Sequence, residues 1–119
     1  MKYIVYAFVD MNDKPYYIGK TNNLLRRRDE HLEEVKKGNK LPKYSKVREI
    51  IKKGGKFKMQ SLAKTLNEAD AYLVERTFIK EYLKRGFKLT NMTEGGPWER
   101  PLKLKLKDIK KKKLKIKRN

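Results

Sequence analysis

The chain has 119 residues, 38% of them hydrophobic, which is enough for one domain with a modest core. It carries 33 Lys and Arg residues against 14 Asp and Glu, and the net charge of +19 favours a polyanionic partner, nucleic acid before membrane. The absence of cysteine excludes disulfides and thiolate metal sites, and the single histidine excludes a multi-histidine zinc site. No apolar segment is long enough to cross a membrane, so we expect an intracellular, cytoplasmic protein.

The N-terminus predicts a β-hairpin. Residues 2–9 are apolar on both faces, which is typical of a central strand, and the Asn, Asp and Pro residues of 10–15 indicate a turn. Residues 16–19 then return as a second strand. Because side chains alternate along a strand, we expect Tyr16 to be a packing residue on the face opposite Tyr17.

Two helices are expected next. The first is capped by one of the polar residues at 21–23, runs to about Lys37 and is closed by Gly38. The second begins near Pro42 and stops at two glycines. The inward positions are Leu24, Leu25, Leu32 and Val35 in the first helix and Tyr44, Val47, Ile50 and Ile51 in the second.

The rest of the chain predicts a strand, the longest helix and a basic arm. Residues 56–62 alternate like a strand, a helix runs from its Asn67 cap to Gly86, and residues 87–92 are a candidate for a short final strand in addition to the three main ones. The predicted fold is therefore α/β, a small three-stranded antiparallel or mixed sheet flanked by helices, over residues 1–96. Residues 97–119 form a lysine-rich C-terminal arm.

The arm has two interpretations. Residues 101–119 contain ten Lys or Arg residues and one Asp, so they carry about half of the excess charge. Alternating leucines there would suit an edge strand. An arm that gains order on a nucleic acid is the favoured interpretation.

A carboxylate interrupts the apolar face of the long helix. At about 100° per residue, Glu75 falls near the centre of the apolar arc, whereas Arg76 falls on the polar side. The arc is formed by Ala71, Tyr72, Val74, Phe78, Ile79, Tyr82 and Leu83. A charge in that position is costly unless it is paired or bound to a cation. Two interpretations stay open: a buried salt bridge to an arginine, or a carboxylate that binds a hard divalent ion such as Mg²⁺.

The first helix places an arginine and the histidine side by side. Arg27 and His31 are four residues apart at the margin of the apolar face, and such a pair suits phosphate binding. Arg28 falls within the apolar arc, where it would either extend its charged end to solvent or pair with Glu75.

The ordered set Tyr6, Tyr17-Ile18-Gly19, Arg27, His31, Glu75 and Asn91 resembles the GIY-YIG nuclease family over about residues 3–96. The second motif is intact. The first reads Ile4-Val5-Tyr6 in place of Gly-Ile-Tyr, and because the missing glycine is a backbone element, Tyr6 is retained as a candidate.

The resemblance implies an Mg²⁺-dependent endonuclease that hydrolyses phosphodiester bonds, with Mn²⁺ expected to substitute. Glu75 would bind the single metal ion, and Arg27 would stabilise charge on the phosphate. Tyr6, or Tyr17 with the roles exchanged, would be the general base. His31 would position water or phosphate, or relay a proton.

Substrate contacts are implied at Gly19, Lys20, Asn91 and Trp98. Asn91 would hold the substrate or the loop near Glu75. Trp98 would either stack on a base or sugar or cap the core, and capping is slightly favoured.

The implied partner is nucleic acid, with DNA favoured over RNA. Low sequence specificity is expected, because a lysine-rich arm binds phosphates without reading bases. The alternative is a non-catalytic basic DNA- or RNA-binding protein on the same fold.

Overall fold

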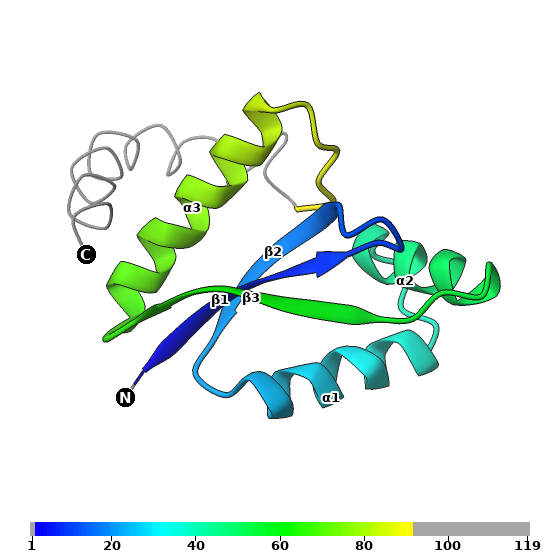
Figure 1. Cartoon of the computed structure of the whole chain (residues 1–119). Helices are drawn as coiled ribbons and strands as arrows, with labels where there is room; N and C mark the ends of the chain where they lie inside the picture. Colours follow the sequence, from blue (N-terminus) through cyan, green and yellow to red (C-terminus); the bar gives the residue numbers. More distant parts are fainter. Residues whose placement is uncertain (1, 92–119) are drawn as a thin grey trace.

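The structure is a computed structural model that describes residues 2–91, in which a three-stranded sheet lies between helices (Figure 1). The strands are β1 (Tyr3–Val9), β2 (Pro15–Thr21) and β3 (Lys58–Thr65), and the helices are α1 (Leu24–Lys36), α2 (Pro42–Lys52) and α3 (Glu68–Lys84). Strand β1 lies between β2 and β3 and pairs antiparallel with both. The α/β fold and the central first strand are confirmed, and the sheet is antiparallel rather than mixed.

A β-bulge in the hairpin changes the predicted orientation of Tyr16. Phe8 pairs with Tyr17 whereas Val9 pairs with Pro15, so Tyr16 is the extra residue on β2. The ring centroids of Tyr16 and Tyr17 lie 5.9 Å and 4.8 Å from that of Phe8, so both rings pack on the same face of the sheet. The prediction of opposite faces was wrong because strict alternation fails at a bulge. Tyr16 is buried and is a packing residue, as expected.

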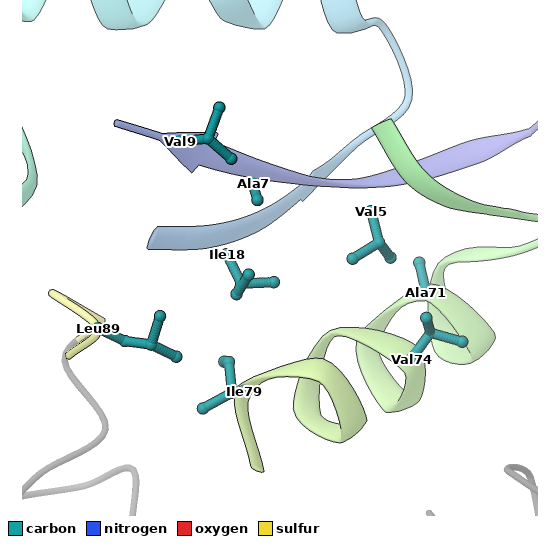
Figure 2. Packing of buried hydrophobic residues seen from close by; sticks show 8 residues of the cluster. All are labelled: Val5, Ala7, Val9, Ile18, Ala71, Val74, Ile79 and Leu89. Atoms are coloured by element: carbon teal, nitrogen blue, oxygen red, sulfur yellow. The ribbon is translucent and has the colours of Figure 1, made fainter. Parts of the chain in front are cut away.

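Alternation along β1 divides the core into two layers. Figure 2 shows the first, in which Val5 of β1 and Ile18 of β2 face Ala71 and Val74 of α3. The second layer lies on the side of α1 and α2, and its buried members are Tyr6, Phe8, Tyr16, Val47, Ile50 and Phe57. In Figure 1, α3 lies on one side of the strands and α1 on the other. Strand β2, at the edge of the sheet, contributes side chains to both layers.

The helix starts follow the predicted capping residues. The side chain of Asn23 accepts a hydrogen bond from the backbone N–H of Arg26, and Asn67 accepts one from Asp70. Pro42 is the first residue of α2, where its missing N–H costs nothing. Helix α1 ends one residue before the predicted Lys37, and Lys37 follows it as the C-cap residue.

Three leucine and isoleucine residues that were expected inside are exposed. They are Leu25, Ile51 and Leu83, with exposed fractions of 76%, 46% and 42%. The buried face of α1 includes His31, so Leu25 falls outside that face, and Arg28 is exposed as well. Ile51 and Leu83 lie in the last turns of their helices.

Arg76 lies inside the protein, contrary to its place on the polar side of the helical wheel. Its side chain is 1% exposed, its guanidinium donates a hydrogen bond of 3.1 Å to the hydroxyl of Tyr72, and it lies 4.6 Å from the centroid of that ring. A long helical side chain leans back over the preceding turn, and here it meets an aromatic ring four residues earlier. The helical wheel failed because it treats the arginine as a point on the helix surface.

The segment after α3 binds the edge of β2 without becoming a strand. The backbone N–H of Thr90 donates to the carbonyl oxygen of Tyr16, and the side-chain amide of Asn91 bonds both backbone groups of Ile18. Residues 87–91 have no strand structure, so the predicted final strand was wrong over this range. Side chains take the place of the backbone ladder that a strand would have formed.

Strand β3 covers Lys58–Thr65, which is shifted towards the C-terminus relative to the predicted range 56–62. The predicted arm, residues 97–119, lies outside the described residues. Among residues 2–91, no helix has the length and apolar character that a membrane span requires.

Candidate active site

The site is built on the pairing of Tyr6 with Gly19 across β1 and β2. A Cβ atom added to Gly19 would lie 2.6 Å from both Cζ and the hydroxyl oxygen of Tyr6, and 3.0 Å from Cε2 of Tyr17. Real Cβ contacts of 2.6 Å do not occur, so only glycine fits between the two rings. Gly19 therefore allows two phenol groups to lie together on the face of α1 and α2.

A chain of hydrogen bonds joins Tyr6 to two helices. Its hydroxyl lies 2.7 Å from Nε2 of His31 in α1, and Nδ1 of His31 lies 2.8 Å from the hydroxyl of Tyr44 in α2. His31 is fully buried. Both ring nitrogens are thus occupied by tyrosines, which leaves neither for direct contact with a phosphate.

Burial keeps the side chains of this hydrogen-bonded series uncharged. It lowers the pKa of His31 to about 3, with smaller contributions in the same direction from the charges of Arg27 and Lys43. Burial also raises the pKa of Tyr6 to about 12, against the opposing effect of Arg27. At neutral pH His31 is an uncharged imidazole, so one ring nitrogen donates and the other accepts.

Arg27 lies at the margin of α1, as the helical wheel predicted. It is half-buried, and Nη1 forms an ion pair of 2.9 Å with Glu30 on the same helix. Its positive charge acts to lower the pKa of both Tyr6 and Tyr17, so the guanidinium lies close to the two phenols. Glu30 is about half exposed, so this ion pair is weak and leaves the guanidinium able to bind phosphate.

Lys43, in the first turn of α2, contacts the second tyrosine. Its ammonium lies 3.2 Å from the hydroxyl of Tyr17, 4.3 Å from the centroid of that ring and 5.1 Å from the ring of Tyr44. Burial lowers the pKa of Lys43 to about 8, helped by Arg27. Burial strongly raises the pKa of Tyr17, and the carboxylate of Glu75 acts in the same direction.

Glu75 reaches the same electrostatic environment from α3. Burial raises the pKa of its carboxyl group, whereas Lys20, Arg76 and Lys43 lower it. The side chain is half-buried and, among residues 2–91, takes part in no ion pair or hydrogen bond. Of the two interpretations of this residue, the described contacts do not include the salt bridge to an arginine.

A half-buried carboxylate with no ion pair or hydrogen bond among residues 2–91 is suited to binding a hard cation. Within the described part of the chain, no three His, Cys, Asp or Glu residues are grouped to hold a metal ion. A site here would therefore use the single carboxylate of Glu75, with water and substrate oxygens as the remaining ligands, an arrangement that Mg²⁺ accepts.

Two of the predicted substrate contacts are engaged within the protein. Lys20 forms a long ion pair of 3.4 Å with the exposed Glu68, which leaves its ammonium able to bind a phosphate. Asn91 is buried, and its amide accepts from Ile18 N–H at 2.9 Å and donates to Ile18 C=O at 2.7 Å. It holds the strand between Tyr17 and Gly19. Trp98 lies outside the described residues.

The structure adds two residues to the predicted set, Lys43 and Tyr44. Tyr44 had been expected only as an inward packing residue. Lys43 had a recognisable signal in the sequence: it is a cation in the first turn of α2, a turn that contains no acidic residue, and the positive end of the helix dipole is unfavourable for a cation there. Such a placement favours a role outside the helix.

One comparison with known proteins gives a match. The family model described as GIY-YIG catalytic domain matches residues 2–90, most of the chain and nearly all of the described part. No curated protein and no solved structure matches.

Proposed function

The chain belongs to the GIY-YIG nuclease family, and on that premise we propose that it is an Mg²⁺-dependent endonuclease that cuts DNA with low sequence specificity. The catalytic domain is a phosphodiesterase domain, its substrate is nucleic acid, and nucleases of this family generally use a divalent metal ion. The choice of Mg²⁺, of DNA and of the residues below is the proposal.

The observation that carries the proposal is that Glu75 is half-buried and has no hydrogen bond or ion pair among residues 2–91. A half-buried carboxylate without a partner among residues 2–91 lies within the electrostatic reach of two tyrosines and two lysines. A purely structural acid would be paired, because an unpaired buried charge is costly. Glu75 would hold the metal ion, which when bound would neutralise charge on a phosphate oxygen and on the leaving 3′ oxygen.

Arg27 and Lys20 would supply the phosphate contacts. The guanidinium of Arg27 offers forked donors to two phosphate oxygens and would stabilise the charge that develops as water attacks the phosphorus. Lys20 follows Gly19, the residue that packs against both tyrosine rings, and would add a positive charge close to the phosphate.

Tyr6 is supported as the general base by its hydrogen bond to His31. As the Tyr6 oxygen takes a proton from water, its own proton would pass to Nε2 of His31 while Nδ1–H stays bonded to Tyr44. The resulting hydroxide would attack the phosphorus, and the bond from phosphorus to the 3′ oxygen would break. The low pKa of His31 makes it a transient proton carrier: the imidazolium would return its proton to the Tyr6 oxygen, and Tyr6 would pass a proton on to the released 3′ oxygen or to water.

The experiment is plasmid nicking with purified full-length protein. We expect relaxed circles with Mg²⁺, with Mn²⁺ as a substitute, and no cutting with EDTA. Glu75→Gln and Glu75→Ala should lower the rate by about 100-fold or more, in the range of other essential catalytic groups. Glu33→Gln, an exposed acid on α1, is the matched control and should cut like the wild type.

Binding to DNA without metal-dependent cutting would overturn the proposal and favour the non-catalytic alternative. A panel of duplex, flap, junction and RNA substrates would then define the substrate class.

A further inference from the structure

Two adjacent residues in the first turn of α2 are linked by hydrogen bonds to the two tyrosines of the site, one directly and one through His31. Tyr44 reaches Tyr6 through His31, whereas Lys43 bonds the hydroxyl of Tyr17 directly at 3.2 Å. Tyr44 is therefore part of the environment of the Tyr6 hydroxyl, and Lys43 is part of the environment of the Tyr17 hydroxyl. The two tyrosines therefore do not have interchangeable environments.

The chemistry of an ammonium fixes the direction of the bond to Tyr17. A lysine ammonium has three N–H donors and no acceptor, so the Tyr17 oxygen must accept from it. Burial raises the pKa of Tyr17 strongly, so at neutral pH its hydroxyl keeps its own proton. That proton cannot point at Lys43 and must point away from it.

We propose that Lys43 is a positioning residue, whose ammonium binds the Tyr17 oxygen and turns the Tyr17 hydroxyl proton towards a phosphate oxygen of the substrate. Tyr17 would then donate a hydrogen bond to the phosphate, which leaves Tyr6 as the base. This inference rests on the proposed function and deepens it, since it separates roles that the sequence left exchangeable.

The charges that act on Lys43 lie on α1 and α3. Arg27 in α1 acts to lower its pKa, while Glu34 in α1 and Glu75 in α3 act to raise it. On β2 and α2, it faces the uncharged rings of Tyr17 and Tyr44. Because the pKa is about 8, the ammonium is present at pH 7 and is lost as the pH rises to 9.

The first test is a double-mutant cycle. Lys43→Met and Tyr17→Phe should each lower kcat by about 10- to 100-fold, as expected for loss of a hydrogen bond that involves a charge. The double variant should cut no more slowly than Tyr17→Phe alone, because Lys43 acts through Tyr17. Lys52→Met, an exposed lysine at the other end of α2, is the matched control. Multiplying effects in the double variant would overturn the proposal.

The second test is the pH dependence of the conservative variant. Lys43→Arg keeps a donor-only cation that stays charged at all working pH values. The ratio of wild-type kcat to that of Lys43→Arg should fall about tenfold between pH 7 and 9, as the wild-type ammonium deprotonates. A ratio that rises over this range would overturn the proposal, because it would make neutral Lys43 a proton acceptor.

A third measurement does not depend on cleavage. The ¹³Cζ resonance of Tyr17 should shift in Lys43→Met relative to the wild type and stay unchanged in Lys52→Met, with Tyr3 as an internal reference. An unchanged Tyr17 resonance in Lys43→Met would overturn the contact. If the wild type does not cut DNA at all, the proposed function fails, and this spectrum still decides whether the contact exists.

Discussion

Gly19 is the residue on which the approach of the two tyrosines depends. We expect Gly19→Ala to displace the ring of Tyr6, because the new methyl group would lie 2.6 Å from two of its atoms. Such overpacking costs about 1–3 kcal/mol and should lower the nicking rate at least about tenfold. Thermal unfolding and plasmid nicking would measure the two effects.

Gly86→Ala is the matched control for that substitution. Gly86 has a φ of +91° and no atom within 4 Å of the added Cβ, so alanine there strains the backbone but leaves the site intact. It should lower stability and leave the nicking rate of the folded protein unchanged. Equal rates for Gly19→Ala and Gly86→Ala would contradict the steric argument.

His31 should make the stability of the protein depend on pH. In the unfolded chain it binds a proton near pH 6.5, whereas in the folded protein it does so only near pH 3. Stability from this residue is therefore complete above pH 6.5 and falls by about 1.4 kcal/mol per pH unit below it. The difference in unfolding free energy between the wild type and His31→Phe should shrink by about 2 kcal/mol from pH 7 to 5.

Urea unfolding at pH 7, 6 and 5 would test this prediction. His31 is the single histidine of the chain, and Glu75, whose raised pKa acts in the opposite direction, is present in both proteins and cancels. Parallel pH profiles for the two proteins would show that the imidazole takes up a proton without unfolding.

At the scale of elements, residues 90 and 91 hold the outer edge of β2. Asn91→Ala would leave the N–H and C=O groups of Ile18 without partners, at a cost of about 1–3 kcal/mol. We expect faster hydrogen exchange at the Ile18 amide and a lower nicking rate, because Tyr17 and Gly19 flank that residue.

Thr90→Val provides a graded control for Asn91→Ala. It removes the side-chain bond to Tyr16 C=O but keeps the backbone bond to the same oxygen, so its effect should be smaller. Unchanged exchange at the Ile18 amide in Asn91→Ala would contradict the role of this segment.

Elements whose signal is local were predictable. The caps at Asn23 and Asn67 and the start of α2 at Pro42 depend on bonds within a few residues. The segment 87–91 was wrongly predicted as a strand because its bonding partner, β2, lies about seventy residues earlier in the chain. No local pattern distinguishes a segment bonded through side chains from one bonded through its backbone.

At the scale of the whole molecule, the lysine-rich arm should supply much of the salt-dependent binding. Deleting residues 97–119 removes more than ten positive charges, as the sequence shows. The slope of log K against log salt should become shallower by about 0.9 for each phosphate that the shortened protein no longer neutralises. Fluorescence anisotropy with a short labelled duplex, over a series of salt concentrations from low to above physiological, would measure this slope.

The shortened protein should keep its fold and residual nicking activity. An unchanged slope would show that residues 1–96 supply the phosphate contacts, and loss of cooperative unfolding would show that the arm is part of the folded domain.

The sequence by itself determined the fold class, because strand alternation and helix caps are properties of neighbouring residues. The family followed from the resemblance of an ordered set of residues, and the same resemblance supplied the candidate catalytic groups other than Lys43 and Tyr44. Only the tertiary structure showed that both ring nitrogens of His31 are hydrogen-bonded to tyrosines, that Asn91 bonds the backbone of β2 and that Lys43 contacts Tyr17. These are contacts between residues 13 to 73 positions apart, and their distances depend on how the helices pack on the sheet.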